Sequence, residues 1–215
     1  MTIDRKAFIR ANTSILSPPL VPEIKLYLAH EALPIWQKTE DELGEIGLPP
    51  PFWAFAWAGG QALARYILDT PSVVLGKSIV EIASGSGMVG IAAMKAGAAS
   101  VLSADIDLFS IAAIEANAKL NHVMLQITSD DLLAQAVPVV DVILIGDLFY
   151  EKGVAERCFA WAQQAKAKGI DVLIGDPGRS YLPKDQLLKV AEYSVPVSRD
   201  LEDAEIKRTA VWRLV

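Results

Sequence analysis

The order of apolar runs is the feature that most constrains how this chain can fold. Short β-branched runs occupy residues 78–83, 100–104, 124–128, 139–145 and 170–175. Longer, alanine-rich runs with helical periodicity lie between most of them, at 60–68, 88–96, 108–117 and 154–168. This alternation predicts a parallel sheet whose crossover connections are helices. The apolar fraction of 52% suits strands that are buried on both faces.

The last part of the chain departs from this alternation. Residues 192–199 and 208–215 both look like strands, and the charged segment LEDAEIK between them leaves no room for a crossover helix. An antiparallel pair at the end of a parallel sheet is typical of the seven-stranded methyltransferase fold, whereas an ordinary dinucleotide-binding fold ends in another parallel strand. We therefore expect an α/β chain with a Rossmann-like, class I methyltransferase sheet of seven strands, mostly parallel with a C-terminal antiparallel strand.

A proline-rich stretch at 48–52 separates this region from the first part of the chain. Pro18, Pro19, Pro22 and Pro34 interrupt the first part, so we expect only short helices with turns between them. The predicted division is a helical N-terminal cap over residues 1–47 and a methyltransferase domain over 48–215. A length of 215 residues suits one hydrophobic core.

Charge and hydropathy limit the partners. The 20 basic and 26 acidic residues give a net charge of −6, without a basic block that would neutralise phosphates, so we expect no nucleic-acid partner. No apolar run approaches the roughly 18 to 20 residues of a membrane span, and the first residues do not resemble a secretory signal. We expect a monomer with no membrane partner, cytoplasmic in a bacterium, or in the mitochondrial matrix if the source is eukaryotic.

The few cysteines and histidines point away from metal and thiol chemistry. Cys158, His30 and His122 are the only such residues, and their spacing matches no metal site. We therefore expect no metal. Cys158 lies in a helix-like run, which favours a packed thiol over a nucleophile.

The segment SIVEIASGSGMVGIAA predicts a buried strand, a glycine-rich turn and a helix. Ser84, Gly85 and Gly87 form a turn in which the backbone approaches a ligand near the start of the helix. Such turns also occur for structural reasons, and a dinucleotide could bind in the same place. Glu81 on the strand before the turn is expensive to bury without a function, so we expect it to meet the charged amino-acid end of a cofactor.

Acidic residues follow the next two predicted strands. Asp105 lies about 20 residues after the glycine turn, the interval at which a carboxylate reaches ribose hydroxyls. Its alternative is a helix N-cap, the role that we prefer for Asp107. Further on, we prefer Asp131 to Asp130 as the acceptor for an adenine amino group, and expect one of the two to be only a cap.

Five segments together resemble a known family. PPFWAFAWAGGQALARYIL, EIASGSGMVGIAA, ADID, GDLFYE and IGDPGR occur in the order found in the electron-transfer-flavoprotein β-subunit lysine methyltransferases, over residues 45–215. The resemblance implies a protein-lysine N-methyltransferase that uses S-adenosyl-L-methionine and acts on the β subunit of electron transfer flavoprotein. Many methyltransferases share the glycine turn, but the combination of the five segments is much more specific.

The resemblance also implies residue roles. Trp57, Gly59, Gly60 and Gln61 resemble the segment that covers the cofactor, and residues 147–150 resemble the motif that lines the methyl-transfer site. Two positions depart from the family pattern. Ala83 replaces the first glycine of the loop, which we expect to require a negative φ, and Ala58 replaces a proline.

Lysine methylation assigns roles to the residues after the fourth predicted strand. The reaction needs an aligned, neutral amine, so we expect Asp147 to orient the acceptor and Phe149 and Tyr150 to form an apolar channel. Phe149 is equally compatible with a core position. Trp53 and Phe55 alternate with Trp57 as in an extended segment, and we assign the first two to packing. Arg179 either recognises substrate or pairs with Asp176.

Three other functions remain open from the sequence. The same cofactor could serve a different protein or a small molecule. The fold could also be a non-catalytic binding module, although Glu81, Gly85, Asp105 and Asp147 are all present. A nicotinamide-dependent oxidoreductase fits the terminal strand pair and the glycine spacing less well.

Overall fold

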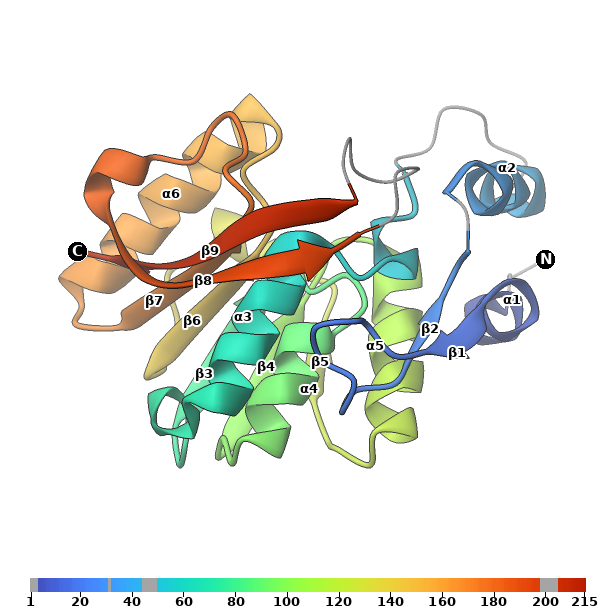
Figure 1. Ribbon diagram of the computed structural model, residues 1–215, viewed down its shortest axis with the longest axis horizontal. Coiled ribbons are helices and arrows are strands. Elements are labelled where there is room, and N and C mark those ends of the chain that lie inside the picture. The colour runs from blue at the N-terminus through green and yellow to red at the C-terminus, as the bar shows by residue number, and fades with distance from the viewer. Residues whose placement is uncertain (1–3, 31, 44–49, 198–204) are drawn as a thin grey trace.

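A seven-stranded sheet forms the centre of the computed structural model, which describes residues 4–30, 32–43, 50–197 and 205–215 (Figure 1). The strand order is β5-β4-β3-β6-β7-β9-β8, and β9 runs antiparallel to both of its neighbours while the pairs from β5 to β7 are parallel. The strands are β3 (Ser78–Ile82), β4 (Ser100–Ala104), β5 (Gln126–Thr128), β6 (Val142–Gly146), β7 (Asp171–Asp176), β8 (Leu187–Pro196) and β9 (Ile206–Leu214). The predicted fold class is confirmed.

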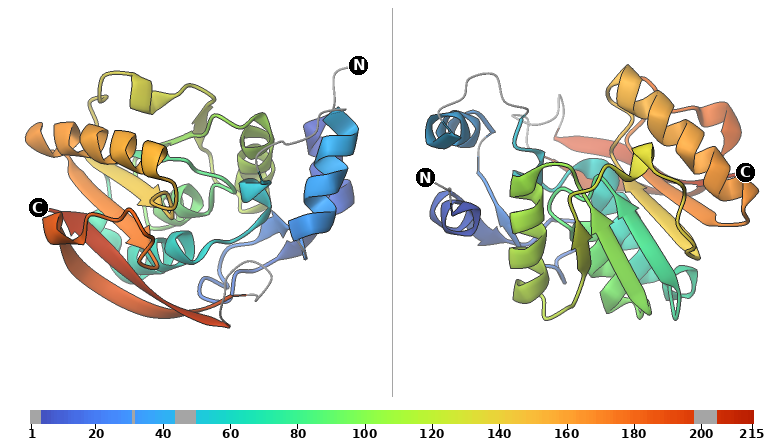
Figure 2. Two further views of the ribbon diagram at one scale, coloured as in Figure 1. Left: turned by 90° about the horizontal axis from the view of Figure 1, so that it is seen from above. Right: turned by 180° about the vertical axis from the view of Figure 1, so that it is seen from behind.

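Helices cover both faces of the sheet (Figure 2). They are α3 (Ala58–Asp69), α4 (Met88–Lys95), α5 (Leu108–Leu120) and α6 (Lys152–Ala167). Successive strand residues point to opposite faces. Thus Val142 and Leu144 of β6 pack in one core with α3 and α4, while Ile143 and Ile145 pack in a second core with α6. None of the helices described in 4–30, 32–43, 50–197 and 205–215 is long and apolar enough to cross a membrane.

Several predicted boundaries were too wide or misplaced. β5 begins at Gln126 rather than Met124, whose side chain is 86% exposed, and β6 begins at Val142 rather than at the fully exposed Val139. β8 begins at Leu187, five residues before the predicted start. Apolar residues at strand ends imitate a strand in the sequence although they lie in connections. The segment LEDAEIK lies largely outside the described residues.

The first part of the chain is not purely helical. Between α1 (Arg5–Asn12) and α2 (Ala32–Leu43), β1 (Ser14–Leu16) and β2 (Leu26–Leu28) form an antiparallel pair. The prediction of helices and turns alone was therefore wrong, because the prolines between the two strands lie in their connection. These elements lie beside α5 (Figures 1 and 2). The ring of Phe8 from α1 packs edge-on against that of Phe109 from α5, with 5.3 Å between the ring centroids. The predicted boundary between residues 47 and 48 lies outside the described residues.

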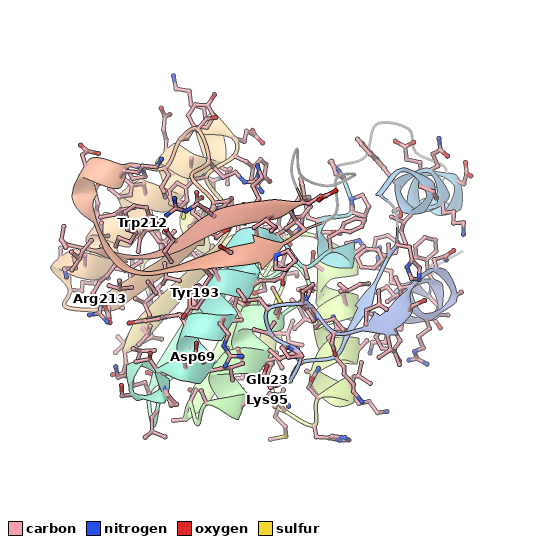
Figure 3. All side chains as sticks on the ribbon, viewed as in Figure 1. Glu23, Asp69, Lys95, Tyr193, Trp212 and Arg213 are labelled. Atoms are coloured by element: carbon pink, nitrogen blue, oxygen red, sulfur yellow. The ribbon has the colours of Figure 1, made fainter. Side chains whose placement is uncertain are left out.

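A polar network joins this first part to α3 and β8. Arg65 of α3 lies 2.8 Å from both Glu23 and Asp69, and the Tyr193 hydroxyl donates to Asp69 at 3.4 Å. Glu23, Asp69 and Tyr193 gather on one face of the molecule (Figure 3). The network thus connects the segment between β1 and β2, which contains Glu23, to α3 and through α3 to β8.

Candidate active site

A cavity of about 470 Å³ opens at the carboxyl ends of β3, β4 and β6. β4 lies on one side of β3 and β6 on the other, so this is the point where the strand order reverses and where ligands of open α/β sheets bind. Most predicted site residues line the cavity, namely Trp57, Gly60, Glu81, Ser84, Gly85, Asp105, Asp131, Asp147 and Tyr150. Gly59, Gly87 and Phe149 are not among its lining residues.

The turn between β3 and α4 uses left-handed backbone conformations. Gly85 and Gly87 have positive φ angles of 53° and 77°. Ala83 also has a positive φ, of 52°, although it carries a side chain. The prediction of a negative φ at Ala83 was wrong. Gly85 borders the cavity, whereas a Cβ on Gly87 would lie 3.2 Å from Ile114, so Gly87 serves the packing of α4 on α5.

Asp105 joins two loops at the edge of the cavity. Its carboxylate accepts hydrogen bonds from the N–H of Gly85 at 2.8 Å and from the N–H of Asp107 at 3.0 Å. Burial raises the pKa of Asp105, and these backbone donors partly oppose the rise. Asp107 is the N-cap of α5, as predicted, and accepts from the N–H of Phe109 at 2.8 Å.

Glu81 is nearly inaccessible, with 2% of its surface exposed, yet it borders the cavity. The Ser103 hydroxyl donates to its Oε2 at 2.7 Å. Burial raises the pKa of Glu81 to about 7, against the lowering effects of Ser103 and of the Gly90 N–H. A Cβ on Gly90 would lie 2.6 Å from the same oxygen, so only glycine leaves room for this carboxylate. A bound cation would favour its ionised form.

The two acids after β5, Asp130 and Asp131, differ in their contacts. Asp131 caps a short 3-10 helix, Leu132–Ala134, by accepting from the N–H of Leu133, and its other oxygen pairs with Arg157 at 2.6 Å. Asp130 is exposed and borders the same part of the cavity. Asp131 is thus a cap, and its contact with an adenine amino group stays a prediction that would use a remaining lone pair.

Asp147 follows β6 in a left-handed conformation, with φ of 57°. Its side chain is 5% exposed and has a partner at each oxygen. Oδ2 accepts from the Gly59 N–H at 2.7 Å, near the start of α3, and Oδ1 accepts from Arg179 Nε at 2.6 Å. Arg179 also lines the cavity. Its Nε pairs with Asp147, its backbone N–H donates to Asp176, and its charge lowers the pKa of Asp176.

Two pairs of glycines bring α3 close to the sheet. A Cβ on Gly59 would overlap the Gly175 carbonyl oxygen and lie 2.9 Å from the Asp147 nitrogen. A Cβ on Gly146 would lie 3.2 Å from the Gly60 Cα. We therefore assign Gly59 to backbone packing instead of direct cofactor contact, because no side chain fits between α3 and β7.

Three aromatic residues that line the cavity, Phe52, Trp57 and Tyr150, contact one another. Trp57 donates from Nε1 to the Phe52 carbonyl at 2.9 Å, and the Phe52 ring contacts Tyr150 with a centroid distance of 5.4 Å. Tyr150 is 42% exposed, whereas Phe149 is fully buried against the α6 side of the sheet. Phe149 therefore belongs to the core and forms no wall of the channel.

The preceding aromatic segment is only partly extended. Phe52–Ala54 forms a 3-10 helix, so the predicted alternation over Trp53, Phe55 and Trp57 was wrong as a description of the backbone. Trp53 and Phe55 are nevertheless buried, in agreement with their assignment to packing.

Sequence reasoning missed several apolar lining residues, namely Pro50, Phe52, Met88, Ile106 and Leu132. Ile106 is 72% exposed and lies between two acids that the sequence did single out. An apolar side chain at a strand's carboxyl end, flanked by polar residues, was the available signal.

The lining chemistry fits S-adenosylmethionine. Carboxylates of Glu81 and Asp105 can accept from ammonium and hydroxyl groups, and Ile106, Met88 and Leu132 offer apolar surface to a base. Gly85 leaves backbone beside the cavity without a side chain. Among residues 4–30, 32–43, 50–197 and 205–215 no group of three or more metal-ligating side chains is found.

Comparisons with known proteins agree with this geometry. The family model described as ribosomal protein L11 methyltransferase matches residues 62–147. Among solved structures, ribosomal protein L11 methylase from Lactobacillus delbrueckii subsp. bulgaricus has a TM-score of 0.53 at 22% identity, covering 75% of this chain and 80% of that one. A methyltransferase described as SMU.776 complexed with SAH has a TM-score of 0.54 at 14% identity, over 79% of this chain and 52% of that one. At these identities the likeness shows the fold.

Curated relatives are much more similar. The electron transfer flavoprotein beta subunit lysine methyltransferase of Rattus norvegicus is 36% identical over 99% of this chain and 85% of its own length. The protein of the same name from Homo sapiens is 36% identical over 96% of this chain and 80% of its own length. This chain is therefore an S-adenosylmethionine-dependent methyltransferase and belongs to the electron transfer flavoprotein beta subunit lysine methyltransferase family.

Proposed function

We propose that this protein methylates lysine side chains of the β subunit of electron transfer flavoprotein. The observation that carries the proposal is the similarity to relatives of that name over nearly the whole chain, which includes the aromatic and Asp147 segments at the acceptor end of the cavity. A match to the cofactor fold alone would not distinguish acceptors, because many methyltransferases share that part.

The residues divide the cavity into a donor end and an acceptor end. Glu81, Gly85 and Asp105 would hold S-adenosylmethionine, through its amino group, backbone contact and ribose hydroxyls respectively. When bound, it supplies a methyl group that moves to the amine nitrogen while the C–S electron pair stays on sulfur. Asp147, Tyr150 and Trp57 then border the space left for the acceptor.

The chain's main contribution at the acceptor end is alignment. Asp147 is fixed by its two hydrogen bonds and by its own N–H, which donates to the Gly175 carbonyl at 2.9 Å. A carboxylate held in this way can orient an amine through the lone pairs that remain. Phe52, together with the ring of Tyr150, which is 42% exposed, offers apolar surface on one side of this space, and apolar surroundings favour the neutral amine that the reaction requires.

The test is an assay on purified electron transfer flavoprotein with methyl-labelled cofactor, followed by peptide mapping. We expect label on lysine side chains of the β subunit. Ribosomal protein L11 serves as the competing acceptor, because its methyltransferase model matches residues 62–147. Label on L11 but not on the flavoprotein would replace this proposal, and label on neither would leave only the enzyme class.

A further inference from the structure

A lone carboxylate beside the acceptor would oppose the reaction. A full negative charge about 4 Å from an amine, at an effective dielectric constant near 20, raises the amine pKa by about 3 units. Lysine ordinarily has a pKa of about 10.4, so such a carboxylate would hold it as an unreactive ammonium ion. Asp147 is buried at this end of the cavity and requires a compensating charge.

Arg179 supplies that charge from the turn after β7. Its Nε lies 2.6 Å from Asp147 Oδ1, and the two side chains are 22% and 5% exposed. The turn itself is fixed by Asp176, whose Oδ1 accepts from the N–H of Gly178 at 2.6 Å and of Arg179 at 2.7 Å. The arginine is thus held in place from its backbone while its guanidinium group reaches Asp147.

We propose that Arg179 is a positioning residue that compensates the charge of Asp147 at the acceptor end of the cavity, so that lysine enters as the free amine and not as an ammonium ion held by Asp147. The inference rests on the proposed function. It assigns to Arg179 a task that neither substrate recognition nor a surface ion pair would include.

Other charged or titratable groups surround this pair. Asp176 lies on β7 and Lys184 lies near Gly178, while Tyr150 and Glu151 belong to the β6–α6 connection. Asp105 and Glu81 line the same cavity from the ends of β4 and β3. Acids outnumber bases in this set, so the compensation that Arg179 provides is local to Asp147, and loss of Arg179 would leave the acceptor end more negative.

The pH range of the test follows from these groups. Burial raises the pKa of Glu81 to about 7 and of Asp176 to about 6. Both carboxyls are therefore mostly ionised above pH 8. Burial and neighbouring negative charges raise the pKa of Tyr150 above its usual range.

The direct experiment measures binding of n-butylamine, a mimic of the lysine side chain, to the protein saturated with S-adenosylhomocysteine. Calorimetry between pH 8 and pH 10 compares the parent with Arg179→Gln. For the parent, affinity should rise close to tenfold per pH unit, because only the free amine binds. For Arg179→Gln, affinity should change less than threefold over the same range, because Asp147 then binds the ammonium form.

Matched variants separate charge from structure. Arg213→Gln removes a different arginine, paired with Asp171 at 3.1 Å at the opposite end of β7, and should behave like the parent (Figure 3 labels Arg213). Arg179→Lys keeps the positive charge and should restore most of the parental pH dependence. Melting temperatures at each pH identify any variant that fails to fold.

Methylation of the flavoprotein gives a second readout. Arg179→Gln should methylate more slowly by about 100-fold or more at pH 7.5, and the loss should persist at pH 10, because a lysine pKa raised by about 3 units stays well above that pH. Methylation by Arg179→Gln within a fewfold of the parent at pH 7.5, parallel butylamine profiles, or no butylamine binding to the parent would each overturn the inference. If the parent does not methylate the flavoprotein, the proposed substrate fails, while the butylamine profiles still decide the role of Arg179.

Discussion

Two helices that point their first turns at the cavity begin with glycines, and they use them differently. At α3, Gly59 and Gly60 follow Trp57, and at α4, Gly85 and Gly87 precede Met88. Each start lies beside a buried acid from neighbouring strands of the sheet. Asp147 after β6 accepts from Gly59 of α3, and Glu81 on β3 lies against Gly90 of α4.

The difference between the two starts lies in what a side chain would meet. At α3 a side chain would collide with the backbone of β7, so the glycines permit contact between a helix and a strand. At α4 the glycines permit left-handed turns with φ of 53° and 77°. The acids differ as well, because Asp147 is paired with a cation and Glu81 with neutral donors. Glycine-rich helix starts therefore do not by themselves identify a ligand-binding backbone.

The largest expected effect tests the packing role at α3. Gly59→Ala places a methyl group against the Gly175 carbonyl, and we expect it to lower the free energy of unfolding by about 3 to 5 kcal/mol. The matched control is Gly153→Ala, which alters the second residue of α6, where nothing lies within 4 Å of the added Cβ. That variant should be neutral or stabilised by up to about 1 kcal/mol in denaturant titrations. Equal stability of the two variants would refute the packing role.

The next effect concerns chemistry at the α3 acid. Asp147→Asn keeps the size and tolerates the left-handed backbone, but it removes the charge. Methylation should fall on the order of 100-fold, close to 3 kcal/mol in activation free energy, while cofactor affinity hardly changes. Raising the pH should not restore the rate fully, because orientation is lost.

Three measurements on one preparation distinguish a structural role of Asp147 from a chemical one. These are melting temperature, adenosylmethionine affinity and single-turnover methylation. A purely structural Asp147 would lower activity only in proportion to the unfolded fraction. A variant that melts, binds and methylates like the parent would show that the acceptor end has been misplaced.

A smaller effect distinguishes the α4 acid. Because the folded-state pKa of Glu81, about 7, lies above its ordinary value of 4.5, this carboxyl stabilises the fold fully below pH 4.5 and loses that contribution as the pH rises through 7. Glu81→Gln does not titrate, so at pH 8 it should exceed the parent in stability by about 2 kcal/mol, with little difference at pH 4.5. Thermal unfolding without cofactor at several pH values measures this.

The same variant should lose cofactor affinity. We expect dissociation constants for S-adenosylmethionine about tenfold higher, because the charged partner of its amino group is gone. Higher stability combined with weaker binding would show that Glu81 is retained for the ligand at the expense of the fold. Unchanged calorimetric affinity at pH 8 would instead make Glu81 a purely internal residue.

The smallest effect concerns the turn before α4. Ala83→Gly should raise the free energy of unfolding by about 0.5 to 1 kcal/mol, because relief of the left-handed alanine outweighs the greater freedom of glycine in the unfolded chain. Ala96→Gly, at the other end of α4 with φ of −82°, is the control and should lower stability. Loss of stability in both variants would mean that the conformation at Ala83 carries no strain.

Local sequence patterns predicted the central strands and the acids at their ends because both follow from short-range chemistry. β3, β6 and β7 are buried on both faces and read as apolar runs, and parallel strands bring Glu81, Asp105 and Asp147 to one edge. The pairing of β1 with β2 was not predictable, since two strands of three residues, separated by a connection that contains three prolines, leave no periodic pattern.

Contacts between distant segments were also beyond local patterns. Arg179 reaches Asp147 from a different loop, and Gly59 touches Gly175 from a different element. The residues around Arg179 in the sequence do not indicate that its side chain reaches Asp147, because Asp176 is much closer along the chain. The left-handed φ of Ala83 likewise depends on the path of the chain from β3 into α4, which residue type alone did not predict.

The position of β9 has a consequence for how the protein is made. β9 follows β8 in the chain yet lies between β7 and β8, so β8 leaves the ribosome before the only strand that joins it to the sheet. Until residues 206–214 emerge, the outer edge of β7 is an open row of unpaired N–H and C=O groups, and a nascent chain in this state is prone to aggregation. A chain truncated before residue 206 would therefore lose two strands from the sheet and not one. The five strands from β5 to β7 could still pair, but β8 would have no neighbouring strand.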